Sequence, residues 1–460
     1  MTRADLATLD EAALEAWLLE RRWFGSKARE VAQIRVLDVV ALDPPAPAPP
    51  ALAVALVEAR FPGGTHDLYQ LPLALRAEGE ADEVAGVDGL AVVDALADED
   101  ALRVLARLLG DAETIEGAHA QVAFEWLADA EPPSPRPTVR AMGADQSNSS
   151  VVFDERLVLK AYRRIEPGDN PELEMLRFLT ARGFENVARL AGWYEYAGEL
   201  LEATLGVVQD YVPGALDGFV LTLDELGSPA HVARLRELGR VIGGMHSVLA
   251  SDANDPAFAP EEPSEESLAL LTATIDEEIE RAFLELPDDP AVAEIAGRGE
   301  EVRDRLRVLS HVGARGKLIR HHGDLHLGQT LLAPDGTWIV LDFEGEPARP
   351  LLERRRKRSP LRDVAGMLRS LAYAASTSEL QRGVPAPDDW EDDAREAFLS
   401  GYKEAVDPVL MPPSEGALRT LLSIFELEKA VYELRYELNN RPDWVRIPVA
   451  GIRRLLEEPL

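Results

Sequence analysis

The residues best suited to chemistry lie in the histidine-rich segment 321–329. Three of the chain's eight histidines fall within six residues, and Asp324 follows a glycine. An aspartate on a tight glycine turn can accept a proton from a hydroxyl nucleophile. Gln329 lies five residues later, and Asp342 ends the apolar stretch 339–341. Their hard oxygen atoms suit Mg²⁺, so the pattern predicts a general base beside a magnesium site.

The histidines allow a second interpretation. His322 and His326 have the His-x₃-His spacing and, with one aspartate, would suit zinc. They could also be ordinary turn residues whose hydrogen bonds are satisfied. The Asp–Gln pair that flanks an apolar strand favours magnesium and phosphoryl transfer instead.

Lysine usage marks one more position. Only six of the 48 basic residues are lysines, and Lys160 is the only one between residues 28 and 316. A lysine in such a sequence is expected where a compact point charge is needed. Lys160 also ends the apolar run 157–159, which is predicted to be a strand. The alternative is a surface ion pair worth less than about 1 kcal/mol.

Composition excludes several classes of function. The chain has 460 residues and a formal charge of −34. Nucleic acid and anionic membranes need a cationic surface, so neither is expected as a partner. A phosphorylated ligand would need a local basic site or a metal. The absence of cysteine excludes disulfides, thiolate zinc sites, iron–sulfur clusters and cysteine nucleophiles.

No segment predicts export or membrane insertion. The first 22 residues are acidic and amphipathic, without the apolar core of a signal peptide. No stretch has 18 uninterrupted apolar residues. The expected compartment is the cytosol.

Apolar periodicity predicts an α+β chain in three parts. A helix over 4–22 and strands at 34–42, 51–61 and 66–75 predict an N-terminal cap, residues 1–88. An intermediate part, 89–210, is expected to begin with a largely helical stretch over 91–128 and a proline-rich linker at 131–137. It continues with a helix at 171–182 and strands at 139–142, 150–153, 157–161, 188–196 and 205–211. The last part, 211–460, is predicted to be mostly helical, with strands at 329–332 and 338–342.

The catalytic segments resemble those of the eukaryotic-like kinase superfamily. The Asp-x₄-Gln pattern is similar to the catalytic loop, and Asp342-Phe343-Glu344 is similar to the metal-binding segment. The His-Gly-Asp-x-His spelling is that of the aminoglycoside-phosphotransferase branch. The resemblance implies that Asp324 is the catalytic base and that Gln329 and Asp342 bind the metal. Gln329 stands where protein kinases have asparagine.

Within that branch, several segments in the same order resemble the maltokinases: 22–27, 146–153, 160–179, 322–350, 359–369 and 428–444. The resemblance implies a two-lobed, kinase-like fold with an N-terminal cap and a helical C-lobe. It implies ATP and Mg²⁺ as cofactors, and the conversion of maltose to maltose 1-phosphate for α-glucan synthesis. A functional link to trehalose synthase and a monomeric state are further expectations.

The same resemblance assigns residues that contact ATP. Lys160 would hold the α- and β-phosphates. Its partner is expected to be Glu174, which follows Asn-Pro-x-Leu as the family's helix glutamate does, and Glu172 is the alternative.

Two loops complete the predicted nucleotide site. Ser147, Asn148 and Ser149 replace the usual glycine-rich phosphate loop; in isolation they would be read as a polar turn. Gln209 and Tyr211 stand at the expected hinge, where backbone groups would pair with adenine.

A helix near the C-terminus is predicted to bind the sugar. Four residues share one face at i, i+3, i+4 and i+7: Lys429, Tyr432, Glu433 and Tyr436. Phenol rings with charged neighbours suit a sugar, although such a face is also common where a helix packs at the edge of a core. The substrate site is expected to include three residues from the catalytic segments: His322, Asp324 and Glu344. Arg362 and Asp363 are interpreted as a structural ion pair.

Two other functions remain open. A related sugar or amino-sugar kinase, such as a glucosamine kinase, could differ by few pocket residues. A kinase-like scaffold without activity is the alternative of a different class. It is disfavoured because Lys160, Asp324 and Asp342 are all present.

Overall fold

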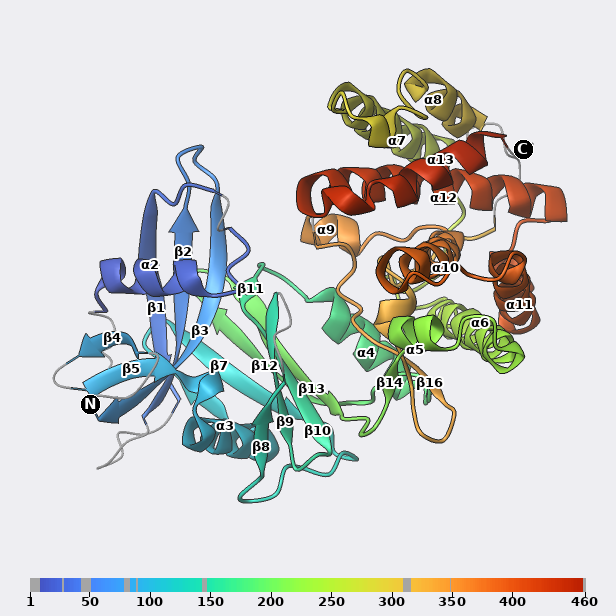
Figure 1. Ribbon diagram of the computed structural model, residues 1–460. Helices are drawn as coiled ribbons and strands as arrows, with labels where there is room; N and C mark the ends of the chain where they lie inside the picture. The colour runs from blue at the N-terminus through green and yellow to red at the C-terminus, as the bar shows by residue number, and fades with distance from the viewer. Residues whose placement is uncertain are drawn as a thin grey trace. The chain divides into compact units, whose positions relative to one another are not determined.

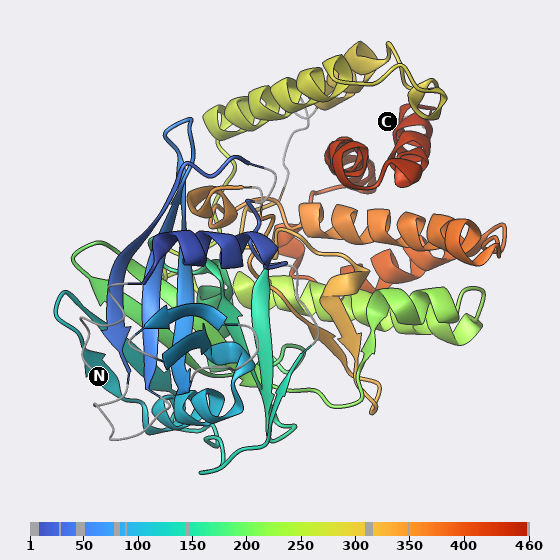
Figure 2. The same ribbon diagram turned by 60° about the vertical axis from the view of Figure 1, so that its left-hand side comes forward.

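The computed structural model describes residues 9–26, 29–42, 51–77, 83–87, 90–142, 147–308, 316–347 and 349–457. The chain divides into two compact units, which are described separately (Figures 1 and 2). The first contains the chain up to Arg177 and Ala188–Pro213, and the second contains Phe178–Val187 and the chain from Gly214 onward. Lys27 and Gln146, from two segments of the predicted resemblance, lie outside the described residues. Among the described helices, none is both long enough and apolar enough to cross a membrane.

The first unit begins with an antiparallel sheet in the order β1-β2-β3-β5-β4. Its strands are β1 (Gln33–Ala41), β2 (Leu52–Arg60), β3 (His66–Ala77), β4 (Glu83–Val87) and β5 (Leu90–Asp94). Helix α2 (Glu11–Glu20) lies across β1 to β3 (Figure 1) and buries Leu14, Trp17 and Leu18. The predicted three-strand meander is therefore present, and two further strands extend it.

A seven-stranded antiparallel sheet completes the first unit, in the order β6-β7-β12-β13-β10-β9-β8. The strands are β6 (Thr114–Glu116), β7 (Ala120–Trp126), β8 (Val139–Ala141), β9 (Asn148–Phe153), β10 (Leu157–Tyr162), β12 (Leu190–Gly198) and β13 (Glu202–Asp210). Helix α4 (Pro171–Ala181) follows the short β11 (Arg164–Ile165), which pairs with β3. Gln70 of β3 is fully buried and donates to the carbonyls of Tyr162 and Leu205, which joins the two sheets.

The prediction of a largely helical stretch over 91–128 is wrong. Only α3 (Glu99–Asp111) is an α-helix, and it ends at Ala112, whose φ is 51°. The following residues form β6 and β7, and β7 alternates buried and less buried positions and pairs with β12. Alternation with period two is typical of a strand, and pairing with a neighbour decides the structure of such a short segment.

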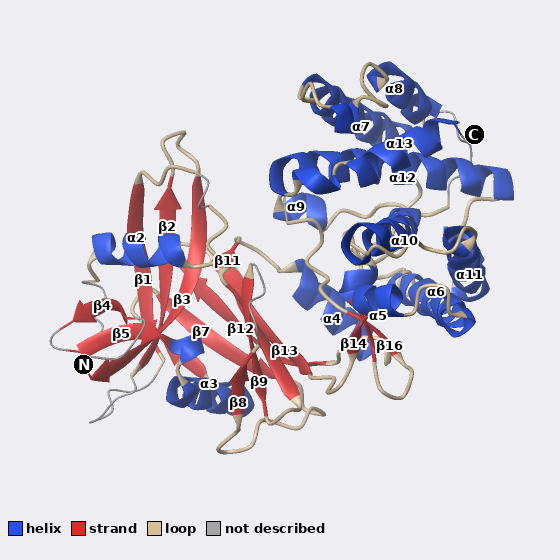
Figure 3. Cartoon of the chain, viewed as in Figure 1, coloured by secondary structure: helices blue, strands red, loops and turns tan. Residues whose placement is uncertain are grey.

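The second unit is mostly helical (Figure 3). Its helices are α5 (Gly218–Asp224), α6 (Pro229–Leu249), α7 (Glu265–Leu284), α8 (Gly299–Arg307), α9 (Leu351–Arg354), α10 (Leu361–Arg382), α11 (Trp390–Ala405), α12 (Glu415–Asn440) and α13 (Arg446–Glu457). A small sheet of β14 (Leu216–Asp217), β15 (Thr330–Leu332) and β16 (Trp338–Val340) carries the predicted metal segment. Helices α6 and α11 pack closely, since a Cβ on Gly401 would lie 1.8 Å from the carbonyl oxygen of Arg236.

Candidate active site

The turn that carries Asp324 is fixed by hydrogen bonds to its backbone. Gly323 has a φ of 86°, a conformation that favours glycine. Asp363 lies at the start of α10 and is 2% exposed. Its carboxylate accepts hydrogen bonds from the backbone N–H groups of His322, at 2.7 Å, and Gly323, at 2.9 Å. The backbone just before Asp324 therefore has a defined position.

A second layer of buried groups holds Asp363. The Nε2 atom of His246 lies 3.0 Å from Asp363 Oδ2, and Nδ1 of the same ring lies 3.0 Å from the hydroxyl of Tyr402. Burial opposes ionisation of Asp363, but the neighbouring His321 and His246 and its hydrogen bonds lower its pKa well below the ordinary value. Asp363 thus supports the turn, although not through the expected ion pair with its neighbour Arg362.

His322 joins the turn to the metal segment. Its side chain is buried, and its Nε2 atom lies 2.8 Å from the carbonyl oxygen of Leu341. Its Nδ1 atom accepts a hydrogen bond from the backbone N–H of Asp324 at 3.3 Å. Both ring nitrogens are therefore engaged, which disfavours a zinc site here. The ring lies outside the pocket described below, so we reassign His322 from substrate binding to positioning.

Gln329 and Asp342 are adjacent in space. Strands β15 and β16 pair, and Gln329 Nε2 donates to Asp342 Oδ2 at 2.9 Å. Asp342 has a φ of 62°, an uncommon conformation for a residue with a side chain. The amide oxygen of Gln329 and the carboxylate of Asp342 are hard oxygen ligands, so the donor set fits a divalent cation such as Mg²⁺.

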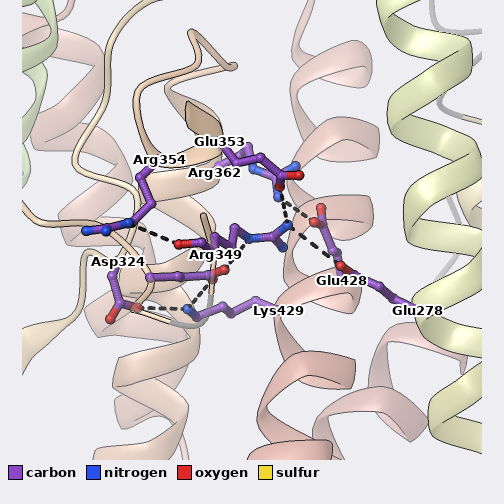
Figure 4. A network of polar contacts seen from close by, with 9 residues as sticks. Glu278, Asp324, Arg349, Glu353, Arg354, Arg362, Glu428 and Lys429 are labelled. Carbon is purple, nitrogen blue, oxygen red and sulfur yellow. Dashed lines mark hydrogen bonds and ion pairs between the residues drawn. The ribbon is translucent and has the colours of Figure 1, made fainter. Parts of the chain in front are cut away.

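Lys429 of α12 contacts the predicted base directly (Figure 4). Its Nζ atom lies 2.9 Å from Asp324 Oδ1 and 3.0 Å from Glu346 Oε1. Burial disfavours the ammonium, but these two carboxylates raise the pKa of Lys429 well above its ordinary value. Burial likewise opposes ionisation of Glu346, yet Lys429 and Arg349 lower its pKa to about 2. Lys429, Glu346 and Arg349 are therefore charged near neutral pH.

These residues lie along a cavity of about 100 Å³ within the second unit. The turn that carries Asp324, residues between Gly345 and Arg358 (α9 included) and helices α7, α10 and α12 line it, and Asp324, Lys429 and Tyr432 all contribute to its wall. Arg349 binds Glu346 Oε2 at 2.6 Å and continues the charge network along the wall (Figure 4). Alternating donors and acceptors beside a candidate base suit a polar acceptor molecule.

The face of α12 that lines this cavity differs from the predicted face. The cavity is lined by Phe425, Glu428, Lys429 and Tyr432. Of the predicted residues, Lys429 and Tyr432 line it, whereas Glu433 and Tyr436 do not. Both sets have the spacing i, i+3, i+4 and i+7, so spacing alone could not separate them.

The remaining substrate-side residues have other partners. Glu433 binds the buried Arg369, with 2.7 Å between Oε2 and Nη2. Tyr436 is 42% exposed and lies outside the cavity lining. The carbonyl oxygen of Glu344 accepts a hydrogen bond from Arg354 at 3.1 Å, and its side chain is not part of the lining. Sequence reasoning missed Glu346 and Arg349, because only folding brings Glu346 next to Lys429 of α12.

In the first unit, the predicted lysine forms its ion pair with Glu172. Lys160 Nζ lies 2.8 Å from Glu172 Oε2, and Glu172 is 1% exposed. The same carboxylate accepts a hydrogen bond from the hydroxyl of Tyr162 at 2.7 Å. We therefore assign Glu172, not Glu174, as the partner of Lys160. The family spelling around the helix had favoured Glu174, and the ion pair seen in the structure contradicts that choice.

The predicted phosphate loop is linked through Arg163 to the end of β5. Ser149 Oγ accepts a hydrogen bond from Arg163 Nε at 2.7 Å, and Arg163 Nη2 binds Asp94 at the end of β5 at 2.5 Å. Asn148 is buried, whereas Ser147 is exposed. Two serines and an asparagine thus lie on or beside β9, next to the strand of Lys160.

The two predicted hinge side chains have structural partners. Gln209 Nε2 donates to the carbonyl of Ala188 at 3.2 Å, and the hydroxyl of Tyr211 accepts from Arg140 at 3.2 Å. Their side chains are therefore engaged within the first unit. Recognition of adenine at this segment would depend on the backbone.

Comparison with known proteins agrees with this architecture. Residues 17–98 match the maltokinase N-terminal cap domain. A glucosamine kinase from Streptacidiphilus jiangxiensis is 29% identical over 338 residues, which cover 70% of this chain and 74% of that protein. A glucosamine kinase from Mycolicibacterium smegmatis is 28% identical over 341 residues, covering 69% and 80%.

Solved structures show the same fold over the whole chain. A glucosamine kinase in complex with glucosamine, ADP and inorganic phosphate has a TM-score of 0.71 at 23% identity, with 99% of each chain covered. Another crystal form of a glucosamine kinase has a TM-score of 0.73 at 22% identity and full coverage. The predicted kinase-like α+β fold with an N-terminal cap is confirmed. Residues 17–98 are thus similar to the maltokinase N-terminal cap domain, and the whole chain has the kinase-like fold of the glucosamine kinases.

Proposed function

We propose that the protein is an ATP-dependent sugar kinase. The observation that carries this proposal is the position of Asp324, whose carboxylate opens onto a polar cavity and follows a turn linked by His322 to the Gln329–Asp342 pair. A base, a hard-oxygen cation site and an acceptor cavity are what phosphoryl transfer to a hydroxyl requires.

In this reaction each of the candidate residues would have its own role. Asp324 accepts the proton of the sugar hydroxyl as its oxygen bonds to the γ-phosphorus and the bond to ADP breaks. Lys160, oriented by Glu172, holds the α- and β-phosphates. Mg²⁺ held by Asp342 and Gln329 would neutralise phosphate charge. Asp363 and His322 keep the turn in place, so positioning and electrostatics supply most of the rate enhancement.

The substrate we favour is maltose, phosphorylated at its anomeric hydroxyl to maltose 1-phosphate for α-glucan synthesis. The match of residues 17–98 to the maltokinase cap supports this choice. We further propose that the enzyme acts as a cytosolic monomer linked in function to trehalose synthase. Glucosamine is the second candidate, because both curated relatives described above are named glucosamine kinases.

A panel of maltose, glucose and glucosamine with ATP and Mg²⁺ tests the proposal. Release of ADP identifies the accepted sugar, and NMR of the product locates the phosphate. Mn²⁺ should replace Mg²⁺, whereas Ca²⁺ should work poorly because of its looser geometry. Undiminished turnover in excess EDTA would reject metal-assisted transfer. Preference for glucosamine would reject maltose but retain the roles of Asp324 and Lys160.

A further inference from the structure

We propose that Arg362 and Glu428 form a clamp that binds two adjacent hydroxyls of the acceptor sugar. Glu428 begins the segment 428–444 of the family resemblance, but neither it nor Arg362 is among the substrate residues predicted from the sequence. The inference rests on the proposed sugar-kinase function and adds the part of the substrate that is recognised. Both residues line the same cavity as Asp324 (Figure 4).

The two side chains form an ion pair that leaves one atom of each group without a partner. Arg362 Nη2 donates to Glu428 Oε1. Arg362 Nη1 and Glu428 Oε2 are both buried and have no hydrogen-bond partner. The Glu428 side chain is only 8% exposed, and it projects from α12 one residue before Lys429. A buried donor and a buried acceptor are therefore held side by side.

Such atoms are rare in folded proteins, because an unpaired buried polar group is costly. Elsewhere in the same network the groups are paired. Both carboxylate oxygens of Glu346 have cations within 3.0 Å. Among the described residues that line the cavity, the unpaired atoms are Arg362 Nη1, Glu428 Oε2 and His321 Nδ1, and only the first two form a donor–acceptor pair, as expected where a ligand supplies the missing partners.

The chemistry of the pair selects a vicinal diol. Arg362 Nη1 can only donate, so it needs an oxygen lone pair from the ligand; Glu428 Oε2 can only accept, so it needs a donor. Two neighbouring sugar hydroxyls supply one of each. The pair has no net charge, which favours a neutral diol over an ammonium group. The ring of Phe425, 5.4 Å from the Arg362 guanidinium, also lines the cavity and offers an apolar surface to the sugar.

The test compares Glu428→Gln and Arg362→Gln with a matched control, Glu426→Gln. Glu426 lies on the same helix and is 2% exposed, but both of its oxygens bind Arg395 and it does not line the cavity. We expect either clamp substitution to raise KM for the accepted sugar about tenfold, the scale of losing a charge-assisted hydrogen bond. KM for ATP should stay within about twofold, and the control should leave both constants unchanged.

Deoxy sugars provide a measurement that does not depend on the variants folding well. The wild-type enzyme should lose about tenfold in kcat/KM with the monodeoxy sugar that lacks a clamped hydroxyl. In Glu428→Gln, kcat/KM should fall much less with the same analogue, because the substitution has already weakened the contact with that hydroxyl. Equal losses in both enzymes, or an unchanged KM in both clamp variants, would overturn the clamp.

Two outcomes separate this inference from the proposed function. If the wild-type enzyme phosphorylates no sugar in the panel, the proposed function is wrong, and so is the clamp that depends on it. If the wild-type enzyme is active and the clamp variants keep its KM for the sugar, only the clamp is wrong. A loss in Glu428→Gln that is confined to glucosamine would replace the diol by an ammonium, and would overturn the choice of a neutral ligand.

Discussion

At the scale of single residues, Lys429 shows why a rare lysine was worth noting. One ammonium lies within 3.0 Å of carboxylate oxygens on both Asp324 and Glu346. A compact charge can sit between two carboxylates, whereas the planar fork of arginine favours one of them in bidentate geometry. The sequence analysis predicted that Lys429 binds the sugar. In the structure, Lys429 is also the partner of the candidate base.

Replacing the base tests the assignment of Asp324. Asp324→Asn keeps the size of the side chain but removes its ability to accept a proton. We expect kcat to fall by about 10²-fold or more, the usual scale for general base catalysis. The variant should still bind the sugar, which calorimetry can measure. A variant with near-normal turnover would contradict the assignment.

Glu346 gives a pH-dependent prediction for stability. Burial, outweighed by Lys429 and Arg349, lowers its pKa from about 4.5 to about 2 in the folded protein. A lowered folded pKa stabilises the fold above the unfolded value, and the stabilisation is lost as pH falls toward the folded value. Glu346→Gln should therefore reduce the free energy of unfolding by up to about 3 kcal/mol near neutral pH.

The difference between wild type and this variant should shrink as pH falls from about 4.5 toward 2, because the wild-type carboxyl becomes protonated there. Urea unfolding at several pH values measures it. Glu353→Gln, at a more exposed position on α9, is the control and should show little dependence of this kind. A constant difference across the range would contradict the role of charge at Glu346.

At the scale of elements, the start of α10 and the face of α12 position the site. Periodicity predicted most of the strands and the helical character of the second unit. The prediction was wrong over 91–128, where pairing of β7 with β12 decides the structure. For α12, the predicted sugar-binding face lies next to the face that lines the cavity. Spacing cannot reveal that Glu433 is taken by the buried Arg369, since that contact depends on how α10 and α12 pack.

The reassigned face can be tested by separating stability from binding. Glu433→Ala leaves Arg369 with a buried, unpaired charge and should lower the free energy of unfolding by about 3 kcal/mol. KM for the sugar should stay close to wild type. Tyr436→Ala, at an exposed position of the same helix, should change neither quantity. A tenfold rise in KM with either variant would restore the predicted face to the sugar site.

At the scale of the whole molecule, the order of motifs along the chain was more informative than composition. The cap, lysine strand, catalytic turn and metal segment predicted a kinase-like fold that the structure and comparisons confirm. Composition supplied only exclusions and a net charge of −34. The contact of His246 with Asp363 and the hydrogen bond from Tyr162 to Glu172 could not be predicted, because each depends on side chains brought together by folding.

That net charge leads to a prediction about ionic strength. A polyanionic nucleotide approaches a protein with 34 excess negative charges, and the cations that would hold it are few and local. Salt screens the long-range repulsion, with a Debye length of about 10 Å at 0.1 M, but weakens close contacts less. Raising NaCl from about 10 to 150 mM at saturating Mg²⁺ should therefore lower KM for ATP about twofold or more. A neutral sugar feels no such field, so its KM, measured in the same assays, should stay constant. A rise in KM for ATP would mean that the local cations around Lys160 control nucleotide binding more than the charge of the whole molecule does.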